Sequence, residues 1–230
     1  KYYKIYFYQQ KYLKKMKLFK KIIRELFRSK LTKKFSNSAK YWEDRYFYGG
    51  NSGKGSYFEN AAEKADYLNA KINQYNIDTI VDIGCGDGNN LKFFESRNYY
   101  GFDVSRTIID YNKKLYDQDK NKKFILIDDN FEKILMDVRN RKDTKNLMCV
   151  SFDVIGHLVE DNVYQDHLEN FSSLNPDYLI ISCYDGDVEY DLSAPHIKQR
   201  NYSKDLIDKG WELIDVHPTN KELKLFKKYN

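Results

Sequence analysis

A short apolar run that leads into three closely spaced glycines constrains the fold of this chain more than any other feature. Residues 79–83 (TIVDI) have the length and composition of a buried β-strand, and Gly84, Gly86 and Gly88 follow at every second position. Glycine is required where the backbone bends sharply or where a ligand contacts the main chain. The pattern, with acidic Asp82 before it, therefore predicts a strand, a ligand-binding turn and then a helix.

Strand-like and helix-like segments alternate along the rest of the chain. Strands are predicted over 79–83, 99–104, 123–127, 147–152, 177–182, 211–217 and 222–229, and helices over 59–75, 89–97, 107–117, 160–174 and 203–209. Alternation of this kind predicts a mostly parallel sheet with helices on both faces. The last two strands are joined by a short turn and can only be antiparallel. The expected α/β fold is thus a seven-stranded, mostly parallel sheet with a C-terminal antiparallel hairpin.

The spacing of the glycines argues against a phosphate-binding loop. A dinucleotide site needs a third glycine three residues after the second, where this chain has Asn89 or Leu91. A P-loop needs GxxxxGK followed by Ser or Thr, but Gly55 follows Lys54 here. Asp87 within the turn would also repel a phosphate. The turn is therefore predicted to hold a different kind of ligand.

The residues VDIGCGDG closely resemble the first motif of class I S-adenosylmethionine-dependent methyltransferases, in which an acidic residue precedes GxGxG after the first strand. YYGFDVS (99–105) is similar to the family's second motif, whose carboxylate accepts hydrogen bonds from the ribose hydroxyls. The resemblance covers about residues 41–229 and implies a Rossmann-like sheet with S-adenosylmethionine as cofactor. It assigns cofactor contacts to Asp82, Gly84, Cys85, Gly86, Asp103, Val104 and Ser105, and an adenine contact to one of Asp128, Asp129 and Asn130.

The segment SFDVIGHLVED (151–161), which follows the fourth strand, is where the acceptor is expected to approach, because ligands of open α/β sheets lie beyond the carboxyl ends of the strands. The enzyme must align the acceptor and, for a hydroxyl, remove its proton. His157 is the candidate catalytic base, since the pKa of histidine lies near neutrality; packing against the next helix is the alternative. Asp153 is expected either to contact the methionine end of the donor or to orient His157.

Three longer segments are similar to a methyltransferase subgroup found with bacterial surface-polysaccharide pathways, namely 41–56, 153–171 and 195–218. This resemblance implies an oxygen of a glycan, sugar nucleotide or capsule-type substituent as acceptor. It also implies a lid segment over 41–58, with Trp42 and Arg45 touching the donor. His196, Lys198 and Arg200 would line the acceptor side and meet an anionic group. The alternative for the lid segment is a plain surface loop, and the alternative for residues 196, 198 and 200 is a solvated basic loop.

The first 40 residues are an extension whose charge is opposite to that of the remaining chain. The net charge is +5, yet 13 of the 39 Lys and Arg residues lie within 1–35 beside a single acid, Glu25. Residues 16–35 predict a basic amphipathic helix that lies on an anionic membrane surface or docks on protein. Residues 41–230 are assigned to the methyltransferase domain. Three well-separated cysteines predict reduced thiols and a cytoplasmic protein, with peripheral contact to the inner membrane face through 16–35.

Other functions are less well supported by the residues. Enzymes that methylate the exocyclic amines of nucleic-acid bases typically carry [DNS]PP[YFW] after the fourth strand, whereas this chain reads SFDV, so no nucleic-acid partner is expected. The four scattered histidines predict no metal site. The alternatives retained are a nucleic-acid methyltransferase, which the basic N-terminus would favour, a small-metabolite methyltransferase, and a non-catalytic module that binds S-adenosylmethionine.

Overall fold

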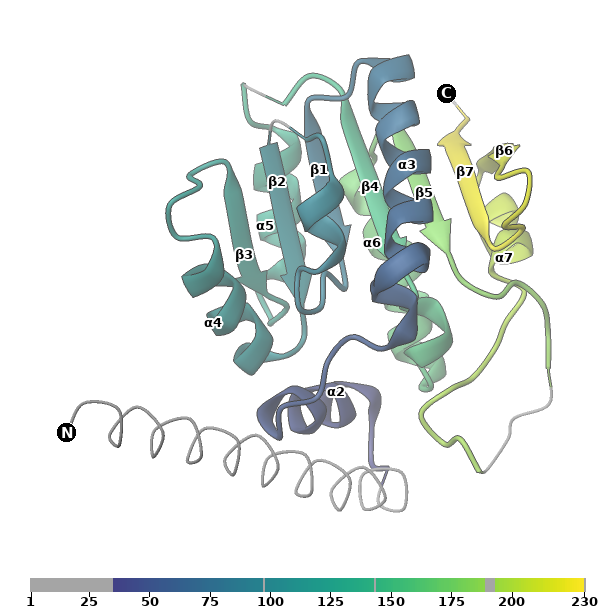
Figure 1. Ribbon diagram of the computed structural model, residues 1–230. Helices are drawn as coiled ribbons and strands as arrows, with labels where there is room; N and C mark the ends of the chain where they lie inside the picture. Colours follow the sequence, from purple (N-terminus) through teal and green to yellow (C-terminus); the bar gives the residue numbers. More distant parts are fainter. Residues whose placement is uncertain (1–34, 97, 143, 189–192, 230) are drawn as a thin grey trace.

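The structure, a computed structural model, describes residues 35–96, 98–142, 144–188 and 193–229 (Figure 1). Its strands are β1 (Thr79–Ile83), β2 (Asn98–Asp103), β3 (Lys122–Leu126), β4 (Leu147–Phe152), β5 (Tyr178–Ser182), β6 (Trp211–Val216) and β7 (Leu223–Lys228). Its helices are α2 (Ser38–Phe47), α3 (Phe58–Tyr75), α4 (Arg106–Leu115), α5 (Phe131–Arg139), α6 (Asp161–Leu174) and α7 (Tyr202–Asp208), with short 3₁₀ turns η1 (Lys54–Ser56), η2 (Asn90–Phe93) and η3 (Ile155–His157). The predicted basic helix over 16–35 lies outside the described residues, except for Phe35.

The seven strands form one sheet in the order β3-β2-β1-β4-β5-β7-β6, which confirms the predicted fold class. Strands β1 to β5 run parallel, and β7 lies antiparallel between β5 and β6. In the middle of the sheet, Val81 pairs with Tyr100 on one side and Cys149 on the other. The strand order reverses between β1 and β4, and open α/β sheets bind ligands at such a switch point.

Helices cover both faces of the sheet because successive residues of each buried strand point to opposite sides (Figure 1). On one face, Ile80 and Val150 pack with residues of α3, η2 and α4. On the other face, Val81 and Cys149 pack with residues of α5, α6 and α7. All five residues of β1 are buried, which explains why its sequence (TIVDI) does not alternate between apolar and polar residues. Figure 1 places α2 at the edge where the parallel strands end.

The helix predicted over 89–97 is wrong, since only the short η2 forms there. A side chain from α3 competes with helix formation: the Asn69 amide donates to the Phe93 carbonyl at 2.8 Å, and its oxygen accepts from the Glu95 N–H at 3.0 Å. These two bonds use backbone groups that a longer helix would need for itself. Local periodicity could not reveal a competitor 24 residues away.

Two helices were not anticipated from the sequence. Helix α5 buries Phe131, Leu135 and Val138, whose spacing is that of one helix face. Helix α2 begins after Asn37, whose side chain accepts from the Lys40 N–H at 2.7 Å as an N-cap, and it runs across the predicted boundary between residues 40 and 41. Within the described residues, no helix is long and apolar enough to cross a membrane.

The C-terminal end of α6 provides a test of the fold. Asn175 is exposed and has a φ of 45°, a left-handed conformation that costs most side chains about 1–2 kcal/mol. We expect Asn175→Ala to destabilise the protein by about 1 kcal/mol, and Asn175→Gly to leave stability nearly unchanged. Chemical denaturation measures both. Asn140→Ala at the end of α5 is the matched control, because Asn140 has a φ of −85°; equal losses at the two positions would contradict the backbone explanation.

Candidate active site

A cavity of about 580 Å³ lies at the carboxyl edge of the sheet, within the size range of small-molecule sites. The glycine turn, the ends of β2, β3 and β4, and residues of α2 and α6 all contribute to its wall. Of the predicted site residues, those that line it are Trp42, Asp82, Gly84, Cys85, Gly86, Asp103, Val104, Asp128, Asp153 and His157. The structure therefore brings most of the predicted residues together.

The glycine turn is shaped so that a side chain could not be accommodated. Gly84 and Gly86 have φ values of 93° and 55°, which favour glycine. A Cβ added to Gly84 would lie 2.3 Å from Val154, and one added to Gly86 would lie 2.3 Å from the Ser52 hydroxyl. The Asn112 amide donates to the Gly86 carbonyl at 2.7 Å and fixes the turn from behind. The main chain is thus left open toward the cavity.

Asp103 ends β2 and accepts one backbone hydrogen bond on each carboxylate oxygen. The Gly86 N–H donates to Oδ2 at 3.0 Å, and the Ser105 N–H donates to Oδ1 at 2.9 Å. Burial raises the pKa of Asp103 to about 6, although the two N–H bonds stabilise the charged form. The carboxylate is therefore mainly ionised at neutral pH and still has lone pairs available to a ligand.

Asp82 lies deeper and is held differently. Its carboxylate accepts from the Tyr99 hydroxyl at 2.7 Å, inside the sheet. Burial raises the pKa of Asp82 to about 7, and the neighbouring Asp103 charge contributes in the same direction. Asp82 consequently changes its charge near neutral pH.

Glu43 of α2 is a site residue that the sequence analysis missed. Its carboxylate accepts from the Ser105 hydroxyl at 2.6 Å, the Thr107 hydroxyl at 2.5 Å and the Thr107 N–H at 3.2 Å. Partial burial raises the pKa of Glu43, but these hydrogen bonds outweigh it, so the pKa lies below its ordinary value. Glu43 thus fastens α2 to the first turn of α4, where a negative charge is favourable. Nothing in the spacing of the sequence links the two segments.

The lid segment (41–58) is hydrogen-bonded to the glycine turn. The Asp87 carboxylate accepts from the Tyr57 hydroxyl at 2.6 Å and the Ser52 N–H at 3.1 Å, and the Asp87 N–H donates to the Ser52 hydroxyl at 2.8 Å. The Asn89 amide also donates to the Ser56 carbonyl at 2.6 Å. Asp87 therefore anchors the lid segment, a role beyond the repulsion of phosphate expected for it.

Only one of the two predicted lid contacts lines the cavity. Trp42 is part of the wall, whereas the Arg45 guanidinium lies over the Trp42 ring at 4.9 Å and its Nε donates to the Asn51 carbonyl at 2.7 Å. Arg45 thus supports Trp42 from behind and holds the following loop. The predicted donor contact of Arg45 is not supported by this position.

Asp153, directly after β4, pairs with a buried lysine of α3. Lys64 is 3% exposed, and its ammonium donates to Asp153 Oδ2. Asp153 adopts a left-handed φ of 59°, and a Cβ on Gly55 would lie 2.0 Å from the same oxygen. The lid segment therefore packs closely on this ion pair. Of the two predicted roles, the position on the cavity wall favours donor contact over orientation of His157.

His157 lies in the 3₁₀ turn that follows Asp153, and its ring is fixed on two sides. Nδ1 is 3.0 Å from the His196 carbonyl, and because a carbonyl only accepts, Nδ1 carries the proton. The Trp42 ring meets the imidazole edge-on at 5.0 Å between centroids. Burial lowers the pKa of His157 below 6.5, and the bond to the His196 carbonyl offsets this only in part. The neutral ring leaves Nε2 as an acceptor.

The three residues predicted to meet an anionic acceptor do not line the cavity. The Lys198 ammonium and the Arg200 guanidinium both donate to Asp161 Oδ1, at 2.6 and 2.8 Å, and Arg200 is 8% exposed. The His196 ring stacks on Tyr41 at 4.6 Å, and burial lowers its pKa to about 4. Because their charges are compensated or absent, the predicted anion contact is not supported.

The structure also separates the candidates for the adenine end. Asp128 lines the cavity, whereas Asp129 and Asn130 are exposed outside it. Ser105 is buried as the N-cap of α4, accepting from the Ile108 N–H and donating to Glu43, so it positions Asp103 and α4 rather than facing a ligand. Apolar Val104, Ile127 and Phe131 form the adjoining wall. A partly apolar wall beside one carboxylate results.

The sheet order and the glycine turn at the switch point define the fold of class I S-adenosylmethionine-dependent methyltransferases. The N-methyltransferase NodS from Bradyrhizobium japonicum, solved in complex with S-adenosyl-L-homocysteine, matches with a TM-score of 0.59 and 11% identity over 85% of this chain and 100% of that chain. A methyltransferase from Anabaena variabilis matches with a TM-score of 0.57 and 12% identity, over 84% of this chain and 96% of that chain. A methyltransferase from Clostridium acetobutylicum matches with a TM-score of 0.52 and 12% identity, over 74% of this chain and 92% of that chain. No protein-family model and no curated protein sequence matches the chain.

The raised pKa of Asp82 predicts a pH-dependent effect of its removal. A carboxyl whose pKa rises from 3.8 unfolded to about 7 folded stabilises the fold at low pH and loses that contribution as pH rises through 7. Relative to wild type, Asp82→Asn should therefore gain about 2 kcal/mol in unfolding free energy between pH 5.5 and 8. The difference between the two proteins cancels contributions from the buried histidines. A pH-independent difference in denaturation would contradict the assignment.

Proposed function

We propose that this protein transfers a methyl group from S-adenosylmethionine to an oxygen of a small glycan-type acceptor. The observation that carries the proposal is Asp103, which is buried at the switch point and held by the Gly86 and Ser105 N–H groups. A carboxylate fixed in this way, with lone pairs remaining, can accept hydrogen bonds from two neighbouring ribose hydroxyls. The glycan-type acceptor rests on the sequence likeness of residues 41–56, 153–171 and 195–218.

The chemistry of the cavity wall fits this donor. Val104, Ile127 and Phe131 suit the faces of an adenine, and Asp128 can accept from its amino group. Asn90 also lines the cavity, and its buried Oδ1 has no partner among the described residues, so it can accept from the donor's ammonium. The carboxylate of Asp103, which has no lysine or arginine partner among the described residues, complements a cation. When bound, S-adenosylmethionine supplies a methyl group on a positively charged sulfur.

His157 is the residue proposed to act on the acceptor. Its Nδ1 proton is held by the His196 carbonyl, so Nε2 can take the proton from an acceptor hydroxyl. Burial lowers the pKa of the imidazole, and the ring is therefore neutral and ready to accept at pH 7. Trp42, edge-on to the ring, helps to keep it in place and screens it from water. His157 thus combines the correct tautomer with a position on the cavity wall.

Removal of the Asp103 carboxylate tests donor binding. We expect Asp103→Ala to weaken the binding of S-adenosylmethionine by about 1–3 kcal/mol, the usual contribution of hydrogen bonds to a charged group. Calorimetry measures this loss. Asp129→Ala is the matched control, because this exposed carboxylate lies outside the cavity wall. NAD should bind neither protein. Unchanged affinity in Asp103→Ala, or stabilisation of the wild type by NAD, would overturn the proposal.

Substitution of His157 tests the transfer step. At saturating donor, His157→Ala should lower turnover by about 10²–10⁴-fold with little change in donor affinity, because a positioned base contributes that much. His217→Ala is the control, since His217 contacts Tyr67 and Glu63 away from the cavity. Wild-type turnover should persist below pH 6.5 and fall as pH drops through the lowered pKa of His157. The same pH profile in His157→Ala would exclude it as the base.

A further inference from the structure

The cavity extends beyond the residues assigned to the donor, along one face of α6. Asn162, Asp166 and Asn170 recur at every fourth position, so they share that face of the helix. All three line the cavity, with Val163 and His167 between them. None of the three side chains bonds to another described residue. This polar stripe, defined as residues 162, 166 and 170, is therefore free to bind a ligand.

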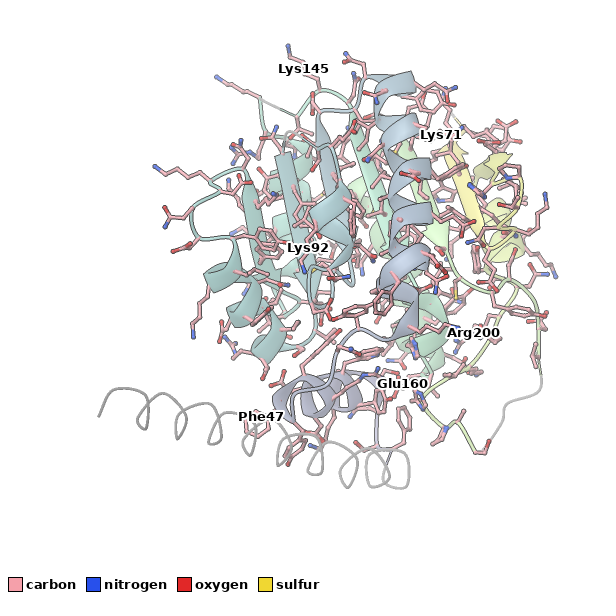
Figure 2. All side chains as sticks on the ribbon, in the orientation of Figure 1. Phe47, Lys71, Lys92, Lys145, Glu160 and Arg200 are labelled. Atoms are coloured by element: carbon pink, nitrogen blue, oxygen red, sulfur yellow. The ribbon has the colours of Figure 1, made fainter. Side chains whose placement is uncertain are left out.

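The charge of the wall disfavours an anionic ligand at the stripe. Among the described residues that line the cavity, none is a lysine or an arginine. Lys64, behind the wall, is paired with Asp153, while Lys198 and Arg200 are paired with Asp161. Glu160 lines the cavity and accepts from the Ser38 N–H and hydroxyl, at 3.0 and 2.7 Å, where α2 begins (Figure 2). A phosphate beside Asp166 would find like charge and no available cation.

The side chains of the polar stripe favour a hydroxyl group of a ligand over an ammonium group. An ammonium only donates hydrogen bonds, so it would leave the NH₂ groups of Asn162 and Asn170 without an acceptor. A hydroxyl both donates and accepts, as an amide does. Two amides and a carboxylate along one helix face thus match a row of hydroxyl groups better than either charged alternative.

We infer that the polar stripe of α6 is the acceptor subsite and that it takes the uncharged, hydroxyl-rich part of the acceptor. This inference rests on the proposed function and narrows it. The part of the acceptor that enters the cavity carries neither phosphate nor amine. The polar stripe takes the place of the anion contact predicted for residues 196, 198 and 200, which do not line the cavity.

Three probes that share one ring test the inference. Methyl glucoside, its phosphorylated form and its amino form are each titrated into the full chain with S-adenosyl-L-homocysteine present, and binding is followed by saturation-transfer NMR. We expect the neutral glucoside to bind about tenfold more tightly than the phosphorylated form, and also more tightly than the amino form. Failure of the neutral glucoside to bind, or preference for either charged form, would overturn the inference.

A pair of variants on α6 separates a local contact from a general charge effect. Asp166→Arg places a cation on the stripe and should reverse the order of the neutral and phosphorylated probes. Gln165→Arg places the same cation one residue away, with a charge change of about one unit rather than two, at an exposed position outside the cavity wall, and should leave the order unchanged. Asn162→Ala should weaken the binding of the neutral probe about fivefold, which is the effect of one lost hydrogen bond. Equal effects of the two arginine variants would contradict the subsite.

Calorimetry with S-adenosylmethionine on the same proteins distinguishes the two proposals. If the wild type does not bind this donor, the proposed function fails whatever the order of the sugar probes. If wild type and Asp166→Arg bind the donor equally and the neutral probe is not preferred, only the acceptor subsite fails. Equal donor affinity together with the expected reversal supports both.

Discussion

The buried carboxylate of Asp103 connects parts of the protein that would otherwise meet only through packing. It bonds to the glycine turn through the Gly86 N–H and to the start of α4 through the Ser105 N–H, and the Ser105 hydroxyl continues to Glu43 of α2. Burying a carboxylate is unfavourable, as its raised pKa shows, so these hydrogen bonds are needed to keep it charged. The site geometry is therefore set before any ligand arrives, which reduces the ordering required on binding.

Among the described residues, the charged side chains on the cavity wall are carboxylates, and the nearby cations Lys64, Lys198 and Arg200 are paired within the protein. Such a site attracts a cationic donor and repels anions, while the paired Lys64 keeps Asp153 from adding a full negative charge. His157 remains neutral in these surroundings because burial disfavours its charged form more than the carboxylates favour it. One arrangement of charges thus suits both donor binding and proton acceptance.

Much of the fold could be predicted because the apolar runs and glycines are local signals: β1 and β4 have the predicted bounds, and Asp103 was located by the resemblance of residues 99–105 to the second motif of the family. Helices α2 and α5 were missed although their signals are local, whereas the other failures involve residues that act across space. Asn69 bonds to the backbone where a helix over 89–97 was predicted, and only η2 forms there. Glu43 of α2 bonds to α4, and Asp161 pairs with Arg200. In each case the two partners are far apart in the sequence. The type and spacing of residues identified the candidate cofactor site, whereas the direction of each side chain required the structure.

The bonds between the lid segment and the glycine turn have a consequence for exchange of bound molecules. Tyr57, Ser52 and Asn89 hold the lid segment through polar groups that water can replace on opening. Tyr41 and Tyr46 of the same segment are buried and Trp42 packs on His157, so opening would also expose aromatic surface and would carry a positive heat-capacity change. Because Tyr41 and Tyr46 lie outside the two core layers of the sheet, such an opening would leave those layers intact, and the residence time of a bound molecule would then be set separately from global unfolding.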